Sequence, residues 1–386
     1  MDDFFINSLT DYYDRFLIKH RRRTEINKFK DIRRQRIVNS RLLTDEEKRE
    51  VDAFYLSHYG ERIPYIWHQY YTAFTGQFDP LYFPELLYIP EFEHFMNPYP
   101  EYVKVFADKN ILPLLASNIN VKTPKVFLSV CKGVFRDGLY RHVKKNDARH
   151  LLFNLGDAFM KPTVDSSSGR GCQVLNIISG CDLISGKSVE ELLQTMPSDY
   201  VIQERLQCHE SIANLYKDSV NTFRVITYRW NDEIKHCPTI MRIGSHGAFL
   251  DNAHAGGMFI GIDDDGTLHD VAFTEFNNSF SEHPDSKILF KDYRISLFPK
   301  ILAAAETLHV LIPQLGLINW DFTLGNDGVP ILIEANTFGG SIWLSEIAHG
   351  KGAFGLDTGD ILRWIAQQKK LKKSKRKAFY FGIIVD

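Results

Sequence analysis

Apolar residues recur at helical spacing near the start of the chain, between residues 15 and 41. Seven of them follow this spacing approximately: Phe16, Leu17, Ile26, Phe29, Ile32, Ile37 and Val38. The pattern predicts a basic amphipathic helix or a pair of helices. Another helix is predicted after Thr44, because Glu47 follows it at the spacing of a capping box. The stretch from Ser296 to Leu311 is also helical in pattern and ends before Pro313.

Two later stretches alternate between apolar and polar residues, as strands do. They run from Leu317 to Leu324 and from Val329 to Ala335, and the sequence GNDG between them is typical of a hairpin turn. In such a hairpin Asp321 lies nearly opposite Glu334, and Asn336 shares a face with Glu334.

The remaining segments indicate the fold class and the order of the lobes along the chain. Residues 60–100 are rich in proline and aromatic residues, which is typical of short elements wrapped on a larger body. From about residue 121 the chain becomes rich in strands and turns. The predicted fold class is therefore α+β, with a helical N-terminal lobe followed by two mixed lobes.

Composition excludes several classes of protein. The 386 residues exceed what one hydrophobic core usually covers, so about two or three domains are expected. With 46 basic against 48 acidic residues the chain is unlike a protein that coats nucleic acid. No apolar run reaches the ~18 residues of a membrane-spanning helix, and the acidic, polar N-terminus is unlike a signal peptide. Five cysteines without a CxxC pair argue against disulfides and zinc, and indicate a cytoplasmic protein.

Basic residues are concentrated in two segments. Residues 15–41 hold eleven Lys or Arg against only two acidic residues, and Lys369–Lys377 forms a second basic block. The ordinary interpretation is a solvated helix face; the alternative is a dock for an anionic substrate, a polyanion or the inner face of a membrane. After the second block, residues 378–385 are apolar and predict a last strand.

The hairpin places two carboxylates and a carboxamide together. Asp321, Glu334 and Asn336 offer the hard oxygen ligands that Mg²⁺ prefers, with phosphates and water completing its coordination. The alternative is a solvent-facing sheet surface with incidental acids. Apolar neighbours of these residues indicate a buried sheet, where unpaired carboxylates would be costly.

A second chemical signal is the small-residue loop Ser166–Gly171, whose backbone N–H groups could wrap phosphate oxygens. It lacks the GKS/T of a P-loop, and a strand follows where a Walker or Rossmann site needs a helix. Lys161, just before the loop, can neutralise a phosphate. Arg224, within a strand, can bind a phosphate or carboxylate in two-pronged fashion or form a structural ion pair.

The order of these motifs along the chain resembles the ATP-grasp superfamily and, more narrowly, its sugar-transfer-associated family. The matching text is LTDEEKREVDAFY, WHQYYTAFTGQFDPLYFPELLY, ADKN, KPTVDSSSGRGC, SVNTFRVITYR, DNAHAGG, INWDF and LIEAN, within about residues 43–356. The resemblance implies a helical or irregular region over residues 1–100, an ATP-grasp first lobe over 101–202, a second lobe with the metal site over 203–365 and a basic tail over 366–386.

The resemblance also implies roles for single residues, by their positions in the motifs. Those implied for nucleotide are Lys109 and Lys161 at the phosphates, Ser167, Ser168, Gly169 and Gly171 in a closing loop, Glu204 and Leu206 at adenine, and His209 or Glu210 at the ribose. Those implied for magnesium are Asp321, Glu334 and Asn336. Arg224 and Arg242 would face the transferred phosphate and the acyl substrate, and Asn252 with the turn Gly256–Gly257 would lie toward the acceptor. Phe338–Gly340 stand where related families often have Pro-Gly, so the acceptor end departs from their pattern.

The reaction implied is ATP- and Mg²⁺-dependent joining of a carboxylate and an amine through an acyl phosphate. The family name points to a sugar-linked acid and an amino acid or amine, in polysaccharide biosynthesis at the cell surface. Two alternatives stay open: an ATP-grasp kinase that phosphorylates a hydroxyl, and a non-catalytic module recruited through the basic segments. The expected partners are small-molecule acid and amine substrates, with no nucleic acid.

Overall fold

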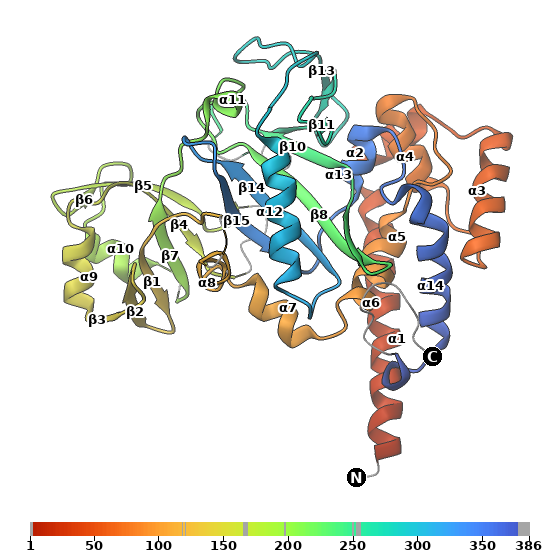
Figure 1. The fold of residues 1–386 in the computed structure, drawn as a ribbon, viewed down its shortest axis with the longest axis horizontal. Helices are drawn as coiled ribbons and strands as arrows, with labels where there is room; N and C mark the ends of the chain where they lie inside the picture. The colour runs from red at the N-terminus through yellow and green to blue at the C-terminus, as the bar shows by residue number, and fades with distance from the viewer. Residues whose placement is uncertain are drawn as a thin grey trace.

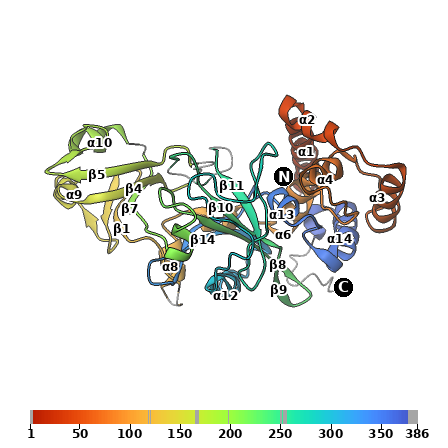
Figure 2. The same cartoon turned by 90° about the horizontal axis from the view of Figure 1, so that it is seen from above.

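A computed structural model describes residues 3–117, 119, 121–164, 169–196, 198–248, 251 and 256–376, with side chains from residue 9 onward except Ser374. It contains a helical N-terminal region and two antiparallel sheets, arranged side by side with the second sheet in the middle (Figures 1 and 2). The structure has the α+β class predicted from the sequence. Within the described residues, none of its helices has the length and apolarity needed to cross a bilayer.

The helical N-terminal region consists of short and long helices packed around buried aromatic side chains. Its elements are α1 (Asp3–Asn27), η1 (Lys28–Lys30), α2 (Ile32–Ser40), α3 (Asp45–His58), α4 (Ile66–Thr75), α5 (Glu85–Leu87), the π-helix η2 (Tyr88–Glu93) and α6 (His94–Met96). The predicted capping box is confirmed, since Glu47 N donates to Thr44 Oγ1 and Thr44 N donates to Glu47 Oε2. The later helices α13 (Trp343–His349) and α14 (Thr358–Lys370) join the same core.

The first sheet follows and has seven strands in the order β3-β2-β1-β7-β4-β5-β6. Its strands are β1 (Val126–Cys131), β2 (Val134–Asp137), β3 (His142–Val143), β4 (Gly156–Pro162), β5 (Gln173–Ile178), β6 (Cys181–Asp182) and β7 (Tyr200–Glu204). The helices α9 (Lys145–Leu152) and α10 (Val189–Thr195) supply buried leucines to its core. The short helices α7 (Pro100–Ala107) and α8 (Leu112–Ala116) connect this lobe to the N-terminal region.

The second sheet has eight strands, in the order β13-β12-β11-β10-β8-β14-β15 with β9 paired to β8. Its strands are β8 (Thr222–Trp230), β9 (Glu233–His236), β10 (Thr239–Ile243), β11 (Met258–Ile262), β12 (Ala272–Phe273), β13 (Ser279–Phe280), β14 (Leu317–Leu324) and β15 (Pro330–Asn336). The helix α12 (Phe298–Val310) covers one face of the second sheet (Figure 1). The short helix α11 (Glu210–Ala213) lies in the segment that connects β7 of the first sheet to β8 of the second.

The predicted hairpin and helix are confirmed. β14 and β15 pair antiparallel with Asp321 opposite Glu334, and the helix predicted over residues 296–311 is α12. Residues 378–385, predicted as a last strand, lie outside the described residues, and the basic block before them continues from the end of α14.

The basic N-terminal stretch lies mainly in the two helices α1 and α2, as its periodicity predicts, and these helices are exposed on one part of their surface and packed on another. Phe29, Ile37 and Val38 are buried, and the Phe29 ring packs edge-on against an aromatic ring of α4 at 5.2 Å. Phe16 and Ile32, expected in the core if the helix packs, are instead more than half exposed. The helices therefore pack through part of their apolar face and present basic residues elsewhere.

Two buried glutamates tie the N-terminal region to the chain beyond β15. Glu93 accepts hydrogen bonds from the backbone of Gly339 at 2.9 Å and of Gly340 at 3.2 Å. Glu85 accepts from the backbone of Ile342 at 2.7 Å and of Trp343 at 3.0 Å. Burial raises the pKa of Glu93 to about 8, although these two backbone donors act against the shift. The two carboxylates fix the segment that leads from β15 into α13.

Candidate active site

Four neighbouring strands of the second sheet bring five polar side chains into one row. Arg242 on β10 pairs in register with Thr222 on β8, Arg224 on β8 pairs with Asp321 on β14, and Asp321 pairs with Glu334 on β15. Residues directly opposite each other on adjacent strands point to the same face of a sheet. The register thus collects residues that are more than a hundred positions apart in the sequence.

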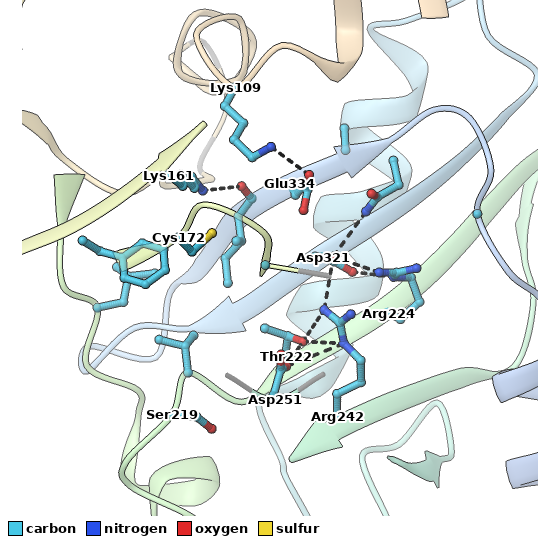
Figure 3. Close-up of a pocket in the computed structure, with 18 of the residues that line it drawn as sticks. Lys109, Lys161, Cys172, Ser219, Thr222, Arg224, Arg242, Asp251, Asp321 and Glu334 are labelled. Carbon is cyan, nitrogen blue, oxygen red and sulfur yellow. Dashed lines mark hydrogen bonds and ion pairs between the residues drawn. The ribbon is translucent and has the colours of Figure 1, made fainter. Parts of the chain in front are cut away.

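Asp321 is the centre of this row (Figure 3). Arg224 donates to it twice, from Nε at 2.5 Å and from Nη2 at 3.0 Å, in the two-pronged geometry expected for a guanidinium and a carboxylate. Arg242 Nη2 lies 3.1 Å from Asp321 Oδ2, and Asn336 Nδ2 donates to the same oxygen at 3.2 Å. Burial favours the neutral acid, but the two arginines outweigh it and hold the pKa of Asp321 below its usual value.

Two buried lysines approach the row from the first lobe. Lys109, in the segment between α7 and α8, forms an ion pair with Glu334 at 2.9 Å. Lys161, at the end of β4, donates to the backbone oxygen of Ile333 at 3.2 Å and so spans the two sheets. Burial and the neighbouring Lys109 lower the pKa of Lys161 to about 8. This pair of cations lies between two sheets, where an anion would relieve both repulsion and desolvation.

These side chains line one cavity of 1470 Å³ between the lobes and the N-terminal region. Drug-sized ligands usually occupy about 300–1,000 Å³, so the cavity has room for more than one small molecule. Among the described residues, ten Lys or Arg line it against six Asp or Glu. The lining therefore favours anions, although the whole chain is close to neutral.

Most of the site residues predicted from the sequence line this cavity: Lys109, Lys161, Gly169, Glu204, Leu206, Arg224, Arg242, Asp321, Glu334 and Asn336. Five of the described residues that were predicted do not line it: Gly171, His209, Glu210, Gly256 and Gly257. His209 instead caps α11, where its Nδ1 accepts from the backbone of Ser211 at 3.2 Å. Ser167, Ser168 and Asn252 lie outside the described residues.

Glu204 has a structural role, because it forms hydrogen bonds with the backbone of Lys125. Its Oε1 accepts from the backbone of Lys125 at 2.7 Å, and its own N–H donates to the Lys125 carbonyl oxygen at 2.9 Å. The segment from Glu204 to Leu206 lines the cavity where the first sheet leads into the second. Its backbone groups are thus held at this end of the cavity.

Thr222 and Asp251 belong to the site but were not predicted. Arg242 donates to Thr222 Oγ1 from Nε at 2.9 Å and from Nη2 at 2.7 Å, and that hydroxyl donates to Asp251. Burial raises the pKa of Asp251 although Arg242 opposes the shift. The position of Thr222 two residues before Arg224 was a usable signal, because alternate strand residues share a face. Asp251 gave no signal of its own in the sequence.

A sequence model of a family described as sugar-transfer associated ATP-grasp matches residues 89–359. The comparison with curated proteins gave no match.

Several solved structures are similar at low identity. An ADP complex of purK, an N5-carboxyaminoimidazole ribonucleotide synthetase, is 13% identical with a TM-score of 0.36, over 61% of this chain and 46% of that one. The VanG D-Ala:D-Ser ligase of Enterococcus faecalis is 14% identical with a TM-score of 0.39, over 69% of this chain and 63% of that one. The D-alanyl-alanine synthetase A of Vibrio cholerae is 14% identical with a TM-score of 0.41, over 70% of this chain and 67% of that one. This chain thus spans less than half of the purK structure, at 46%.

Proposed function

The chain belongs to the sugar-transfer associated ATP-grasp family, and from this membership we propose that it is an ATP-dependent carboxylate–amine ligase. The row of Arg242, Arg224, Asp321 and Glu334 beside two buried lysines supports this function, because it combines hard oxygen ligands with cations in a single cavity. Transfer of a phosphoryl group depends on positioning and on neutralising charge, and such a row supplies both.

Asp321, Glu334 and Asn336 are the residues that would hold magnesium. They fit a hard cation, since two carboxylates and a carboxamide from β14 and β15 line the cavity together. When bound, the metal neutralises the charge of the triphosphate. In the structure Asp321 pairs with the two arginines and Glu334 pairs with Lys109, and these cations hold the two carboxylates in place.

The lysines and the segment after β7 would bind the nucleotide. Lys161 and Lys109 are placed to meet the phosphates, and the backbone of Glu204–Leu206 to meet adenine. Gly169, within the Ser/Gly loop, and Cys172, directly after it, also line the cavity. Closure of that loop over the phosphates would exclude water from the reaction.

Lys161 gives the first test of nucleotide binding. Lys161→Met should weaken ADP affinity at least ~10-fold, because methionine keeps the length of the side chain but removes the charge that meets phosphate. Isothermal titration calorimetry measures this. Lys187→Met, at an exposed position of the same lobe, is the control and should bind ADP like the wild type. Equal affinity in the two variants would remove Lys161 from the nucleotide site.

The proposed reaction has two steps. A substrate carboxylate oxygen attacks the γ-phosphorus of ATP, the bond to the β–γ bridging oxygen breaks, and ADP leaves. The amine then attacks the acyl carbon, the carbon–oxygen bond to phosphate breaks, and the nitrogen loses a proton. Arg224 and Arg242 line the cavity beside Asp321 and would neutralise the phosphoryl group and the substrate carboxylate.

The family description supports a proposal for the class of substrate. It associates this family with sugar transfer, so we propose a sugar-linked acid and an amino acid or amine, joined in cell-surface polysaccharide biosynthesis. An enzyme of this biosynthesis that uses ATP would work on the cytoplasmic side of the membrane. The basic residues near both ends of the chain would suit contact with an anionic membrane surface.

Trapping with hydroxylamine tests the activity before the natural amine is known. The purified protein is incubated with ATP, magnesium, hydroxylamine and a panel of sugar acids, and ADP and hydroxamate are measured together. A ligase should release ADP only with an acid present and form hydroxamate in equal amount, because the acyl phosphate reacts with the amine. A kinase would release ADP and form phosphomonoester without hydroxamate. No acid-dependent ADP release from the panel would contradict both activities.

A further inference from the structure

Three basic residues from the N-terminal helices line the same cavity as the metal and nucleotide residues. They are Arg21 on α1, Lys28 in η1 and Arg34 on α2, and together they form what we call the N-terminal cationic subsite. All three precede residue 89, where the match to the ATP-grasp family begins. The family's shared segment therefore does not account for them.

The subsite lies beyond the proposed metal ligands. The chain passes from Asn336 on β15 into Phe338, and the Arg21 guanidinium stacks over the Phe338 ring at 4.6 Å. Phe338 is half exposed and lines the cavity. The segment proposed for adenine, Glu204–Leu206, comes from the first lobe, which lies on the opposite side of the second sheet from α1 and α2 (Figures 1 and 2). The subsite is thus on the side of the cavity away from the segment proposed for adenine.

Groups behind the cavity wall hold two of these cations in place. Lys28 pairs with the buried Glu25 at 2.5 Å, and Arg34 pairs with the buried Glu275 at 3.0 Å. Neither carboxylate lines the cavity. A cation held from behind by a carboxylate loses little freedom when it meets a ligand, which favours binding.

Arg21 is held differently, by the imidazole of His94. Its Nη1 lies 3.2 Å from His94 Nδ1, and His94 Nε2 lies 2.8 Å from the buried Asp14. This arrangement fits a tautomer in which His94 donates to Asp14 and accepts from Arg21. Burial lowers the pKa of Arg21, and the nearby Glu93 opposes the shift. Arg21 thus presents its charge to the cavity beside an exposed aromatic ring.

We infer that the N-terminal cationic subsite binds a phosphate group carried by the sugar-linked acid, in addition to the carboxylate that is activated. This inference rests on the proposed function and adds a substrate class to it. Phosphate suits two arginines and a lysine, since guanidinium binds its oxygens in two-pronged fashion and ammonium adds a point charge. The ring of Phe338 offers an apolar surface for the sugar next to these cations.

Binding of inorganic phosphate tests the subsite directly. The full-length protein is first saturated with magnesium and a non-hydrolysable ATP analogue, so that the site of the γ-phosphate is filled. Inorganic phosphate is then titrated and followed by ³¹P NMR. Arg21→Gln should weaken phosphate binding at least ~10-fold, because it removes the charge of a guanidinium, while the nearby Glu93 keeps its hydrogen bonds from Gly339 and Gly340. Affinity for the analogue should stay unchanged.

A matched control and a second variant complete the test. Arg23→Gln makes the same change at an exposed position of α1 that does not line the cavity, and it should bind phosphate like the wild type. The double variant Glu25→Gln/Lys28→Gln removes a whole ion pair. It should weaken the binding of inorganic phosphate as Arg21→Gln does. No phosphate binding by the wild type, or equal binding by Arg21→Gln and Arg23→Gln, would overturn the subsite.

Titration with acetate under the same conditions separates the anions. Binding of phosphate but not acetate supports a phosphate on the substrate, whereas equal binding of both would overturn that assignment in favour of any second anionic group. None of these measurements involves turnover. Failure of the subsite therefore leaves the hydroxamate assay intact as a separate test of ligase activity.

Discussion

Replacement of Glu334 by glutamine is expected to lower the rate of ADP formation at least ~100-fold, because phosphoryl transfer depends on the charge that a metal ligand helps to place. Glutamine keeps the shape of the side chain and an oxygen that can accept from Lys109, which pairs with Glu334 at 2.9 Å. The fold should therefore survive, as measured by circular dichroism and thermal unfolding. Glu306→Gln, at an exposed position of α12, is the matched control. If Glu334→Gln keeps more than about a third of wild-type activity, Glu334 is not a metal ligand.

Asp321 should respond differently from Glu334, although both lie on the same hairpin. Sequence alone predicts that alanine at either position removes activity and leaves the fold intact. In the structure Asp321 balances Arg224 and Arg242, both little exposed. Leaving a buried ion without its partner costs about 3–5 kcal/mol. Asp321→Ala is thus expected to lose stability as well as activity, so Glu334 is the better position for testing the chemistry.

Deletion of residues 1–40 should have the largest effect on stability and give insoluble protein. Three buried apolar side chains, Phe29, Ile37 and Val38, would be lost from the core. Removing one large side chain from a core costs about 2–5 kcal/mol, and a domain is stable by only about 5–15 kcal/mol. Expression, solubility and size-exclusion chromatography measure the outcome.

Charge and packing can be separated with one further variant. Lys30→Gln/Arg36→Gln removes two exposed basic residues, one from η1 and one from α2, and leaves the apolar face of these helices unchanged. This variant should stay soluble with an unchanged melting temperature, because surface substitutions usually change stability by less than about 0.5 kcal/mol. A soluble, monodisperse product of the 1–40 deletion with the wild-type melting temperature would contradict the packing role of α1 and α2.

Local patterns predicted the parts of the fold that depend on neighbours in sequence. The GNDG turn and the alternation on either side of it were enough to pair Asp321 with Glu334. The capping box at Thr44 and the helix α12 were predicted for the same reason. In each case the signal and the structure that it specifies lie within one or two elements.

Local sequence patterns could not predict the contacts between distant segments. Thr222 and Asp251 meet through a hydrogen bond, and Arg21 reaches Phe338 across more than three hundred residues. The basic N-terminal stretch looked like a solvated face because its charges dominate its composition, whereas packing is decided by a few apolar residues such as Phe29. Which face of a helix meets the rest of the protein depends on a partner that its own sequence does not identify.

The two glutamates that hold the segment after β15 also bear on where this chain can be cut. Glu85 lies before residue 89, where the family match begins, and Glu93 lies just after it. A fragment trimmed to the matched region would keep Glu93 but leave the backbone N–H groups of Ile342 and Trp343 without their carboxylate acceptor. The segment that matches the family and the smallest unit that can fold are therefore expected to differ here, and a stable shortened protein would have to begin upstream of residue 89.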